Sequence, residues 1–505
     1  MSPSQDPMSN RHAPLPLLVV AQAVISAASL VVEIVAGRML APHVGMSLYT
    51  WTAVIAVVLA GFSAGHWWGG RLAEKPTAQS LNWTGGALIA AAVTTSGTVL
   101  LLPMFANPVL SASPDPVWGT TALTLLVFFL PSFFAGTPAP VLAKIAVTTA
   151  ERTGPALGAM FAAGAIGAIA GTLLAGFLFI SWLGSTLTLF VVTVIYFACA
   201  ALFFWLGGLP WSRASLTGLL VLPVTLMALA SPSPCDRESR YFCLRVDDLS
   251  ADPSQPVHLM VIDHLAHGIS ARDLPEVQFT KHTAMLDHLA QLRSQRADFA
   301  SFHIGGGNYA IPRAFAFRET GPITVAEIDP AVTEMAEASF WFDPAKATVL
   351  HEDGRRALLT RPETAYDIVI GDAFTDVVVP VHLVTREFFQ LVADRLTPDG
   401  SFLMNVIDYE DRLGAVASIT ATMQTVFPVV EVWTEFSQPV PGQRMVFVVV
   451  AGASRTGVDE FSVPAPDLTR FGALADAQVM QMVAAHGQVL TDDYAPIDRL
   501  IGRSD

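Results

Sequence analysis

Long apolar runs fill the first 230 residues of this 505-residue chain. Only 12 charged side chains occur up to Ala230, seven basic and five acidic, so this part carries about +2 of a net charge of −15 and the remainder carries about −17. A helix of roughly 20 apolar residues is long enough to cross a bilayer. The pattern therefore predicts a multi-pass helical membrane domain over residues 1–231, with the lipid bilayer as its partner.

We expect about seven membrane spans in this domain. They lie near residues 15–37, 48–68, 83–104, 119–137, 157–180, 184–206 and 214–230. Gly61, Gly65 and Gly69 recur every four residues, and Gly167 and Gly171 repeat the spacing. Glycines at this interval favour close packing of two helices in lipid.

Glu33 is an acid deep inside an apolar run. An ionisable residue at that depth is costly, so Glu33 is a candidate substrate contact. A structural contact with a neighbouring helix is the alternative, and both interpretations stay open.

Residues 232–298 predict a β-hairpin module followed by a lead-in helix near 276–293. Residues 299–505 alternate strand and helix patterns, which predicts a mostly parallel, Rossmann-like α/β domain. The expected strands are 299–304, 323–328, 347–350, 366–371, 401–406, 428–434 and 444–451, and the expected helices are 308–318, 330–338, 384–396 and 412–425.

A nucleoside-binding pattern opens this domain at residues 303–330. Gly305, Gly306 and Gly307 follow the first strand, where they let the backbone approach a ligand. Glu327 follows about 20 residues later, the usual distance for an acid that binds ribose hydroxyls. Asp353 and Asp372 follow the next two strands. Parallel strands end at one rim of the sheet, so these acids predict a nucleoside site, although a helix N-cap is the alternative for any single acid.

Composition narrows the ligand classes. The acidic second half has no basic run, which argues against nucleic acid. No cysteine and histidine cluster has metal spacing, so we expect no metal.

The segments GGGNYAIPR, VAEIDP, EDGRRAL, YDIVIGDAF and LVTREFFQLVADRLTPDG, in this order, resemble the spermidine synthase (polyamine aminopropyltransferase) family. VIDHLAHG, DAFTDVVVPVHLVTREFF and LTDDYAPIDRL resemble its membrane-fused bacterial branch. The resemblance implies a β-hairpin module, a Rossmann-like sheet, a homodimer and a place in the bacterial inner membrane. It also implies decarboxylated S-adenosylmethionine, or S-adenosylmethionine itself, as co-substrate, an amine or polyamine acceptor, and 5′-methylthioadenosine as by-product.

The same resemblance implies residue roles. The three glycines line the methionine-derived part of the donor, Glu327 binds the ribose, and Asp353 accepts from the adenine amino group. Asp372 accepts the proton of the attacking amine. Asp376 corresponds to the second acid of the family's D-x-x-D motif, with one extra residue between them.

The acceptor side departs from the family pattern. An acid expected after the glycines is Asn308, and the tyrosine-histidine-glutamate cluster of the lead-in helix is replaced around His282. His282, Asp492 and Asp493 are therefore tentative substrate contacts, and a structural turn is the alternative for the two aspartates.

The sequence thus predicts a membrane-bound aminopropyltransferase for polyamine synthesis. One rival is an S-adenosylmethionine-dependent methyltransferase or another alkyltransferase. A second rival is a polyamine or nucleoside transporter or sensor whose Rossmann domain only binds.

The side of the membrane on which the α/β domain lies is predicted from charge. Basic residues follow the second, fourth and sixth spans: Arg71, Lys75, Lys144, Arg152 and Arg213. The positive-inside rule places these loops in the cytoplasm. Seven spans then place the α/β domain on the outer face, where Cys235 and Cys243 can oxidise. The cytosolic origin of the donor argues for the inner face instead, and the charge bias favours the outer face.

Overall fold

The computed structural model describes residues 13–113, 115–374, 379–436 and 442–500. The chain divides into two compact units, which we call the helical unit (Met1–Cys243) and the α/β unit (Leu244–Asp505). This is the predicted fold class, an apolar helical region followed by a Rossmann-type domain.

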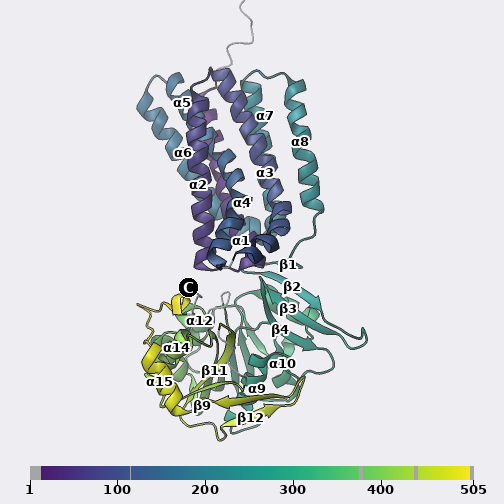
Figure 1. Cartoon of the computed structure of the whole chain (residues 1–505), viewed down its shortest axis with the longest axis vertical. Helices are drawn as coiled ribbons and strands as arrows, with labels where there is room; N and C mark the ends of the chain where they lie inside the picture. Colours follow the sequence, from purple (N-terminus) through teal and green to yellow (C-terminus); the bar gives the residue numbers. More distant parts are fainter. Residues whose placement is uncertain (1–12, 114, 375–378, 437–441, 501–505) are drawn as a thin grey trace, which may run out of the picture. The chain divides into compact units, whose positions relative to one another are not determined.

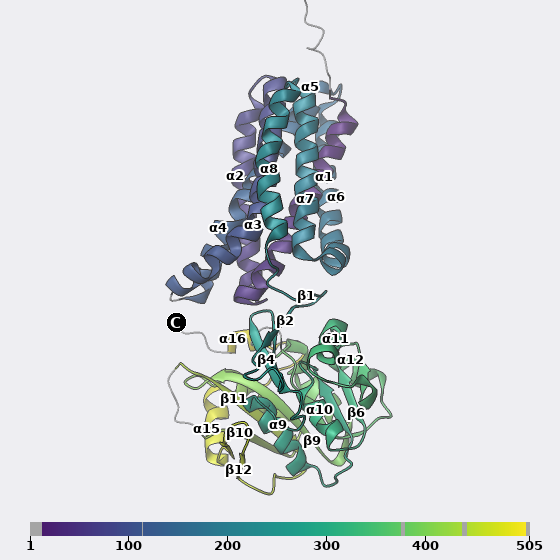
Figure 2. The ribbon, with the colours of Figure 1, turned by 90° about the vertical axis from the view of Figure 1, so that its right-hand side faces the viewer.

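The helical unit consists of long helices that run side by side (Figures 1 and 2). They are α1 (Leu15–Val44), α2 (Leu48–Ala73), α3 (Thr77–Ala112), α4 (Pro116–Gly136), α5 (Pro138–Thr149), α6 (Thr153–Leu174), the π-helical η1 (Ala175–Phe179), α7 (Ile180–Leu206) and α8 (Trp211–Ala230), and a short strand β1 (Arg237–Glu238) follows.

In the described part of the chain, five apolar stretches are long and apolar enough to cross a membrane: Leu15–Val44, Leu48–Ala73, Thr77–Ala112, Val117–Thr149 and Thr153–Leu206. The last is 54 residues long and contains Gly184, whose φ of 71° interrupts the helix. Gly167 and Gly171 pack on Ala23 and Ala27 of α1, so α6 runs parallel to α1. The chain then reverses at Gly184, because α7 leads from there back along α1. Each of the seven predicted spans falls on a helix of its own. That the chain crosses the membrane seven times stays a prediction.

The predicted glycine contacts are confirmed. A Cβ atom added to Gly65 would lie 2.1 Å from the carbonyl oxygen of Phe133 in α4, and one added to Gly69 would lie 2.2 Å from that of Thr137. A Cβ added to Gly167 would lie 2.1 Å from the carbonyl oxygen of Ala23. The helices therefore touch through their backbones, as expected for glycines spaced four apart.

A short loop, residues 235–243, is anchored at the end of the bundle where α1 finishes. Cys235 and Cys243 form a disulfide. Arg38 in α1 donates to the carbonyl oxygens of Tyr241 and Ser239, the latter at 3.1 Å. Glu238 accepts from the backbone amide of Ser185 at 2.9 Å, beside the Gly184 reversal. We call this segment the disulfide loop.

The α/β unit begins with an antiparallel meander of β2 (Cys243–Asp248), β3 (Val257–Ile262) and β4 (Leu265–Ala271), which matches the predicted hairpin module. The lead-in helix is α9 (Lys281–Arg293).

The main sheet has nine strands in the order β12-β13-β10-β11-β9-β8-β5-β6-β7. Their bounds are β5 (Ser301–Ile304), β6 (Ile323–Ala326), β7 (Thr348–Leu350), β8 (Tyr366–Gly371), β9 (Leu396–Tyr409), β10 (Val429–Glu435), β11 (Arg444–Gly452), β12 (Glu460–Val463) and β13 (Thr469–Ala473). The five neighbouring strands β9, β8, β5, β6 and β7 pair in parallel. The remaining four strands, β11, β10, β13 and β12, pair antiparallel, and β11 joins β9 in the same way. The sheet is therefore mixed rather than mostly parallel, because a short connection from β10 to β11 permits antiparallel pairing and parallel neighbours need a longer crossover.

Helices cover both faces of this sheet (Figure 1). They are α10 (Ala310–Phe317), α11 (Pro330–Ser339), α12 (Gly354–Thr360), α13 (Arg386–Ala393), α14 (Gly414–Gln424), α15 (Asp476–His486) and α16 (Ile497–Leu500), with 3₁₀ turns at Pro344–Lys346 and Val381–Leu383. Apolar residues of α12, α13, α14 and α15 form one continuous core with Phe302, Phe402 and Val449 of the sheet. This core fixes the strand ends, where the polar residues gather.

Candidate active site

The site lies where the strand order of the sheet reverses. β5 pairs in parallel with β6 on one side and with β8 on the other, with Ile304 opposite Gly371. The connections after β5 and β8 consequently leave the sheet in different directions and open a crevice between them. Ligands of doubly wound sheets bind at this kind of switch point.

The glycine turn after β5 requires residues without a side chain. Gly305 has a φ of 91°, and a Cβ there would lie 2.6 Å from the backbone oxygen of Asp372. A Cβ on Gly306 would lie 2.3 Å from the Tyr309 ring. Glycine is the residue that relieves both constraints. The backbone of the glycine turn therefore lies in direct contact with the loop after β8.

Glu327 lies just beyond the end of β6 and is 6% exposed. Its carboxylate accepts from the backbone amides of Gly306 at 2.8 Å and Asp329 at 2.9 Å. Burial raises the pKa of Glu327 to about 6, against the effect of these hydrogen bonds. Each carboxylate oxygen keeps a further lone pair, so the group can also accept hydroxyl donors of a ligand.

Asp353 caps α12 through a hydrogen bond from the backbone amide of Arg356 at 2.9 Å. Its other oxygen lies 2.7 Å from Nε2 of His382. Burial would raise the pKa of Asp353, but the hydrogen bonds from His382 and the helix amide outweigh it, and the pKa is lowered. The N-cap interpretation is therefore correct for Asp353.

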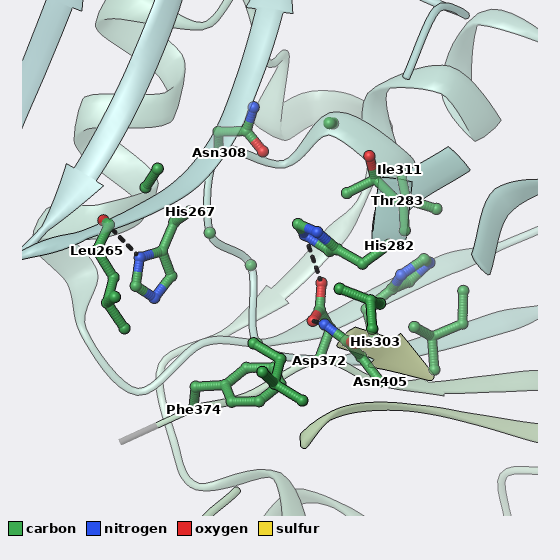
Figure 3. A pocket seen from close by; sticks show the side chains of 18 of the residues that line it. Leu265, His267, His282, Thr283, His303, Asn308, Ile311, Asp372, Phe374 and Asn405 are labelled. Carbon is green, nitrogen blue, oxygen red and sulfur yellow. Dashed lines mark hydrogen bonds and ion pairs between the residues drawn. The ribbon is translucent and has the colours of Figure 1, made fainter. Parts of the chain in front are cut away.

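A cavity of about 270 Å³ opens beside the glycine turn. Figure 3 shows the side chains of Asp372, Asn405, His282, His267 and Asn308 around it. Asn405 in β9 donates from Nδ2 to Oδ1 of Asp372 at 2.8 Å, and Nε2 of His282 lies 3.9 Å from the other oxygen. Oδ1 of Asn405 is buried and has no hydrogen-bond partner in the described structure. Asp372 and the amide oxygen of Asn405 are therefore two acceptors for an amine.

Two further histidines at the cavity are held neutral. Burial lowers the pKa of His303 to about 3, and its Nε2 lies 3.1 Å from Oγ of Ser301. Burial also lowers the pKa of His267, whose Nδ1 lies 3.1 Å from the carbonyl oxygen of Leu265. Since a carbonyl only accepts, Nδ1 of His267 is the donor and Nε2 keeps a lone pair.

Comparison with known proteins identifies this unit. A sequence profile of the spermine/spermidine synthase domain matches residues 281–459. The chain carries a spermine/spermidine synthase domain. The match begins at α9 and ends before β12, so it includes the glycine turn and all the strand-end acids described above.

Individual relatives match parts of the synthase domain. A polyamine aminopropyltransferase of Vibrio vulnificus is 33% identical over 106 residues, which is 20% of this chain and 36% of that protein. An N-terminal histidine N-methyltransferase of Emericella nidulans is 30% identical over 151 residues, 28% of this chain and 26% of that protein. A probable spermidine synthase from Corynebacterium glutamicum has a crystal structure with 19% identity and a TM-score of 0.44, covering 52% of this chain and 97% of that one. The chain thus spans between about a quarter and a half of the length of the curated relatives that it matches.

Some predicted residues of the synthase domain meet at the cavity and others do not. The three glycines, Asp372 and His282 line it. Asp492 instead forms an ion pair with Arg355 at 2.6 Å and accepts from Thr385 at 2.7 Å.

The remaining predicted residues lie elsewhere. Asp493 is exposed and does not line the cavity. Glu33 belongs to α1 of the helical unit, and Asp376 falls outside the described residues.

Sequence reasoning missed three polar residues that line the cavity, Asn405, His267 and Arg444. Asn405 lies inside β9, so a search for polar residues that follow a strand did not reach it. His267 occurs in the segment VIDHLAHG, whose function was not assigned. Arg444 has no local signal, because the pairing of β11 with β9 brings it to the site.

Proposed function

We propose that the chain is a membrane-bound aminopropyltransferase that moves an aminopropyl group from decarboxylated S-adenosylmethionine to an amine and releases 5′-methylthioadenosine. The observation that carries this proposal is the pairing of Asp372 with Asn405 at the edge of a cavity in a spermine/spermidine synthase domain. A carboxylate and a free amide oxygen beside the glycine turn suit an amine that attacks a bound sulfonium.

The reaction needs a positioned acceptor for one proton. The amine nitrogen attacks the methylene carbon bonded to the sulfonium, a carbon–nitrogen bond forms, and the carbon–sulfur electron pair returns to sulfur as a neutral thioether. Alkylamines have a pKa of about 10, so the nucleophile has to lose a proton. Asp372 takes this proton, and alignment of nitrogen, carbon and sulfur lowers the barrier further.

The donor is held by the groups around the switch point. Glu327 accepts hydrogen bonds from the ribose hydroxyls, and Asp353 accepts one from the adenine amino group. Gly305 to Gly307 line the aliphatic part of the donor next to its sulfur. His282 lies on the acceptor side of Asp372. Asp376 is retained as the second acid of the motif on the strength of the resemblance.

A methyltransferase is the second candidate, because the fungal histidine methyltransferase matches a quarter of this chain. Both reactions use a sulfonium donor and strand-end acids. They differ in the by-product, which is methylthioadenosine for aminopropyl transfer and S-adenosylhomocysteine for methyl transfer. A transporter or sensor would bind methylthioadenosine and consume no donor.

Mass spectrometry of products tests these possibilities. The purified full-length chain in detergent is incubated with decarboxylated or intact S-adenosylmethionine and a panel of amines. We expect methylthioadenosine together with an alkylated amine. S-adenosylhomocysteine alone would instead establish the methyltransferase, and an unconsumed donor with every amine would refute transfer.

We further propose that the chain lies in the bacterial inner membrane with its α/β unit on the outer face. The disulfide loop is anchored at the end of the bundle where α1 finishes, and α2 begins only three residues after α1. Arg71 is near the opposite end of α2, about 35 Å from Leu48 at the usual helical rise per residue. Lys144 donates to the carbonyl oxygen of Ala73 at that far end.

This separation of charge from the disulfide supports the proposed orientation. Basic loops favour the cytoplasm, and disulfides persist in oxidising compartments. Leu244 directly follows the disulfide in sequence, so the α/β unit emerges on the same face. A C-terminal fusion to alkaline phosphatase is expected to be active in cells, whereas fluorescence of the matched green fluorescent protein fusion without phosphatase activity would contradict this orientation.

A further inference from the structure

The cavity beside Asp372 has an unusual balance of charge for a site that receives polyamines. Asp372 is the one carboxylate among the described residues that line the cavity, and Arg444 is a permanent cation at the same cavity. His267 and His303 are kept neutral by burial. Apart from His282, the described lining therefore sets one carboxylate against one permanent cation.

Arg444 is directed to the cavity by the pleat of the sheet. In the ladder between β9 and β11, Tyr409 lies opposite Arg444 and Ile407 lies opposite Val446. Residues two apart on a strand share a face, and Asn405, Ile407, Arg444 and Val446 all line the cavity. The guanidinium thus belongs to the same face as the Asn405 amide that binds Asp372.

The guanidinium of Arg444 retains donors for a ligand. Its Nε donates to the Tyr409 hydroxyl at 3.2 Å, and its Cζ lies 5.6 Å from the centre of the Tyr409 ring. These contacts leave both Nη groups available, and within the described residues no carboxylate forms an ion pair with Arg444. A planar guanidinium supported on an aromatic ring is suited to bind a carboxylate through two hydrogen bonds.

The family resemblance predicts an acid directly after the glycines, and this position is occupied here by the uncharged Asn308. Asn308 donates from Nδ2 to the Ser270 hydroxyl at 3.0 Å, and a Cβ on Gly268 would lie 2.2 Å from the Asn308 side-chain oxygen. The asparagine is therefore packed into the meander. The cavity has a cation at Arg444 and lacks a carboxylate at residue 308.

These charges conflict with two fully cationic substrates. Decarboxylated S-adenosylmethionine carries a sulfonium and an ammonium group, and a diamine keeps at least one ammonium group when its other amine attacks. Asp372 is the one carboxylate for these cations at the described lining, Asp376 lies outside the described residues, and Arg444 repels them. One carboxylate on either substrate removes this conflict, because it can pair with Arg444.

We propose that one of the two substrates carries a carboxylate that binds Arg444 while the attacking amine faces Asp372 and Asn405. This inference rests on the proposed function. The zwitterionic group has two possible sources, the intact tail of S-adenosylmethionine or an amino-acid acceptor.

The chemical balance is the same for both sources. With intact S-adenosylmethionine, the new carbon–nitrogen bond joins a 3-amino-3-carboxypropyl group to the amine. With an amino-acid acceptor, an aminopropyl group is joined to its side-chain amine. In each case the carbon–sulfur bond breaks, its electron pair returns to sulfur, Asp372 takes one proton, and methylthioadenosine is released.

Matched substrates that differ by one carboxylate test the inference. The donors are S-adenosylmethionine and its decarboxylated form, and the acceptors are ornithine against putrescine and lysine against cadaverine. Release of methylthioadenosine is measured for each combination with the wild-type full-length chain. We expect a preference of roughly tenfold or more for the carboxylated member in either the donor or the acceptor arm, and the arm identifies the source.

Variants of Arg444 connect that preference to the guanidinium. Arg444→Gln is expected to abolish the preference, and Arg444→Lys, which keeps the charge, is expected to retain part of it. Arg470→Gln is the matched control, because Arg470 also lies over an aromatic ring, 5.4 Å from the centre of Phe436, and does not line the cavity.

Failure of this inference is distinguishable from failure of the proposed function. Release of methylthioadenosine with equal or better use of the decarboxylated members overturns the inference alone, and so does a preference that survives in Arg444→Gln. No methylthioadenosine from any combination refutes the proposed function. Calorimetric titration with each matched ligand then decides the inference, which is overturned if the carboxylated members do not bind more tightly.

Discussion

Methylthioadenosine binding is expected to weaken by about tenfold between pH 7 and pH 5 because of Glu327. Burial raises the pKa of this carboxyl from 4.5 to about 6. In its proposed role the ionised form accepts hydrogen bonds from the ribose hydroxyls, so affinity is full well above pH 6 and is lost as the pH falls through that value. With a pKa near 6, about 91% of the group is ionised at pH 7 and about 9% at pH 5, a ratio of about ten.

Isothermal titration calorimetry with methylthioadenosine measures this dependence directly, because the ligand has the ribose and lacks the charged tail. Glu327→Gln is the control, since glutamine keeps the size of the side chain and does not titrate. We expect the variant to bind more weakly at pH 7 and to show a flat profile. A flat wild-type profile, or an equal slope in the variant, would refute the assignment of Glu327 to the ribose.

Three other predictions concern the base, the bundle and the disulfide. Asp372→Asn should lower turnover by roughly 100-fold with little change in methylthioadenosine affinity, and unchanged turnover would remove Asp372 from the mechanism. Gly65→Val should destabilise the bundle by about 1–3 kcal/mol through overpacking, measured by thermal unfolding in detergent, whereas Gly70→Val should not, because a Cβ at Gly70 meets nothing within 4 Å. A membrane-impermeant thiol reagent should label Cys235 in intact cells only after reduction, and labelling without reductant would contradict the disulfide.

Local sequence patterns were sufficient to place the residues of the proposed donor side on their strands. Each strand from β5 to β8 has its own periodicity and is followed by its own glycine or acid, so the positions of Gly305 to Gly307, Glu327 and Asp372 after these strands could be predicted from neighbouring residues. Strand β9 runs from 396 to 409, which is longer than the predicted 401–406. Asn405 was missed because it lies within this strand, where a polar residue gives no turn signal.

The acceptor side depends on contacts between residues distant in sequence. Arg444 reaches the cavity only because β11 pairs with β9 in an antiparallel register, and the order of strands in a mixed sheet is a property of the whole fold. Asp492 shows the opposite case. Its sequence position suggested a substrate contact, but the ion pair with Arg355 attaches the C-terminal segment to α12.

The backbone contacts in the helical unit limit where any solute could travel. Carbonyl oxygens of α4 and α1 lie so near Gly65 and Gly167 that a single methyl group would collide with them. The interfaces of α2 with α4 and of α1 with α6 are therefore sealed along these glycines, and opening either one would require whole helices to separate. A passage through the bundle would have to follow another interface, such as the one among α3, α7 and α8, where the Ser96 hydroxyl contacts those of Thr193 and Thr225 at 2.9 and 3.1 Å.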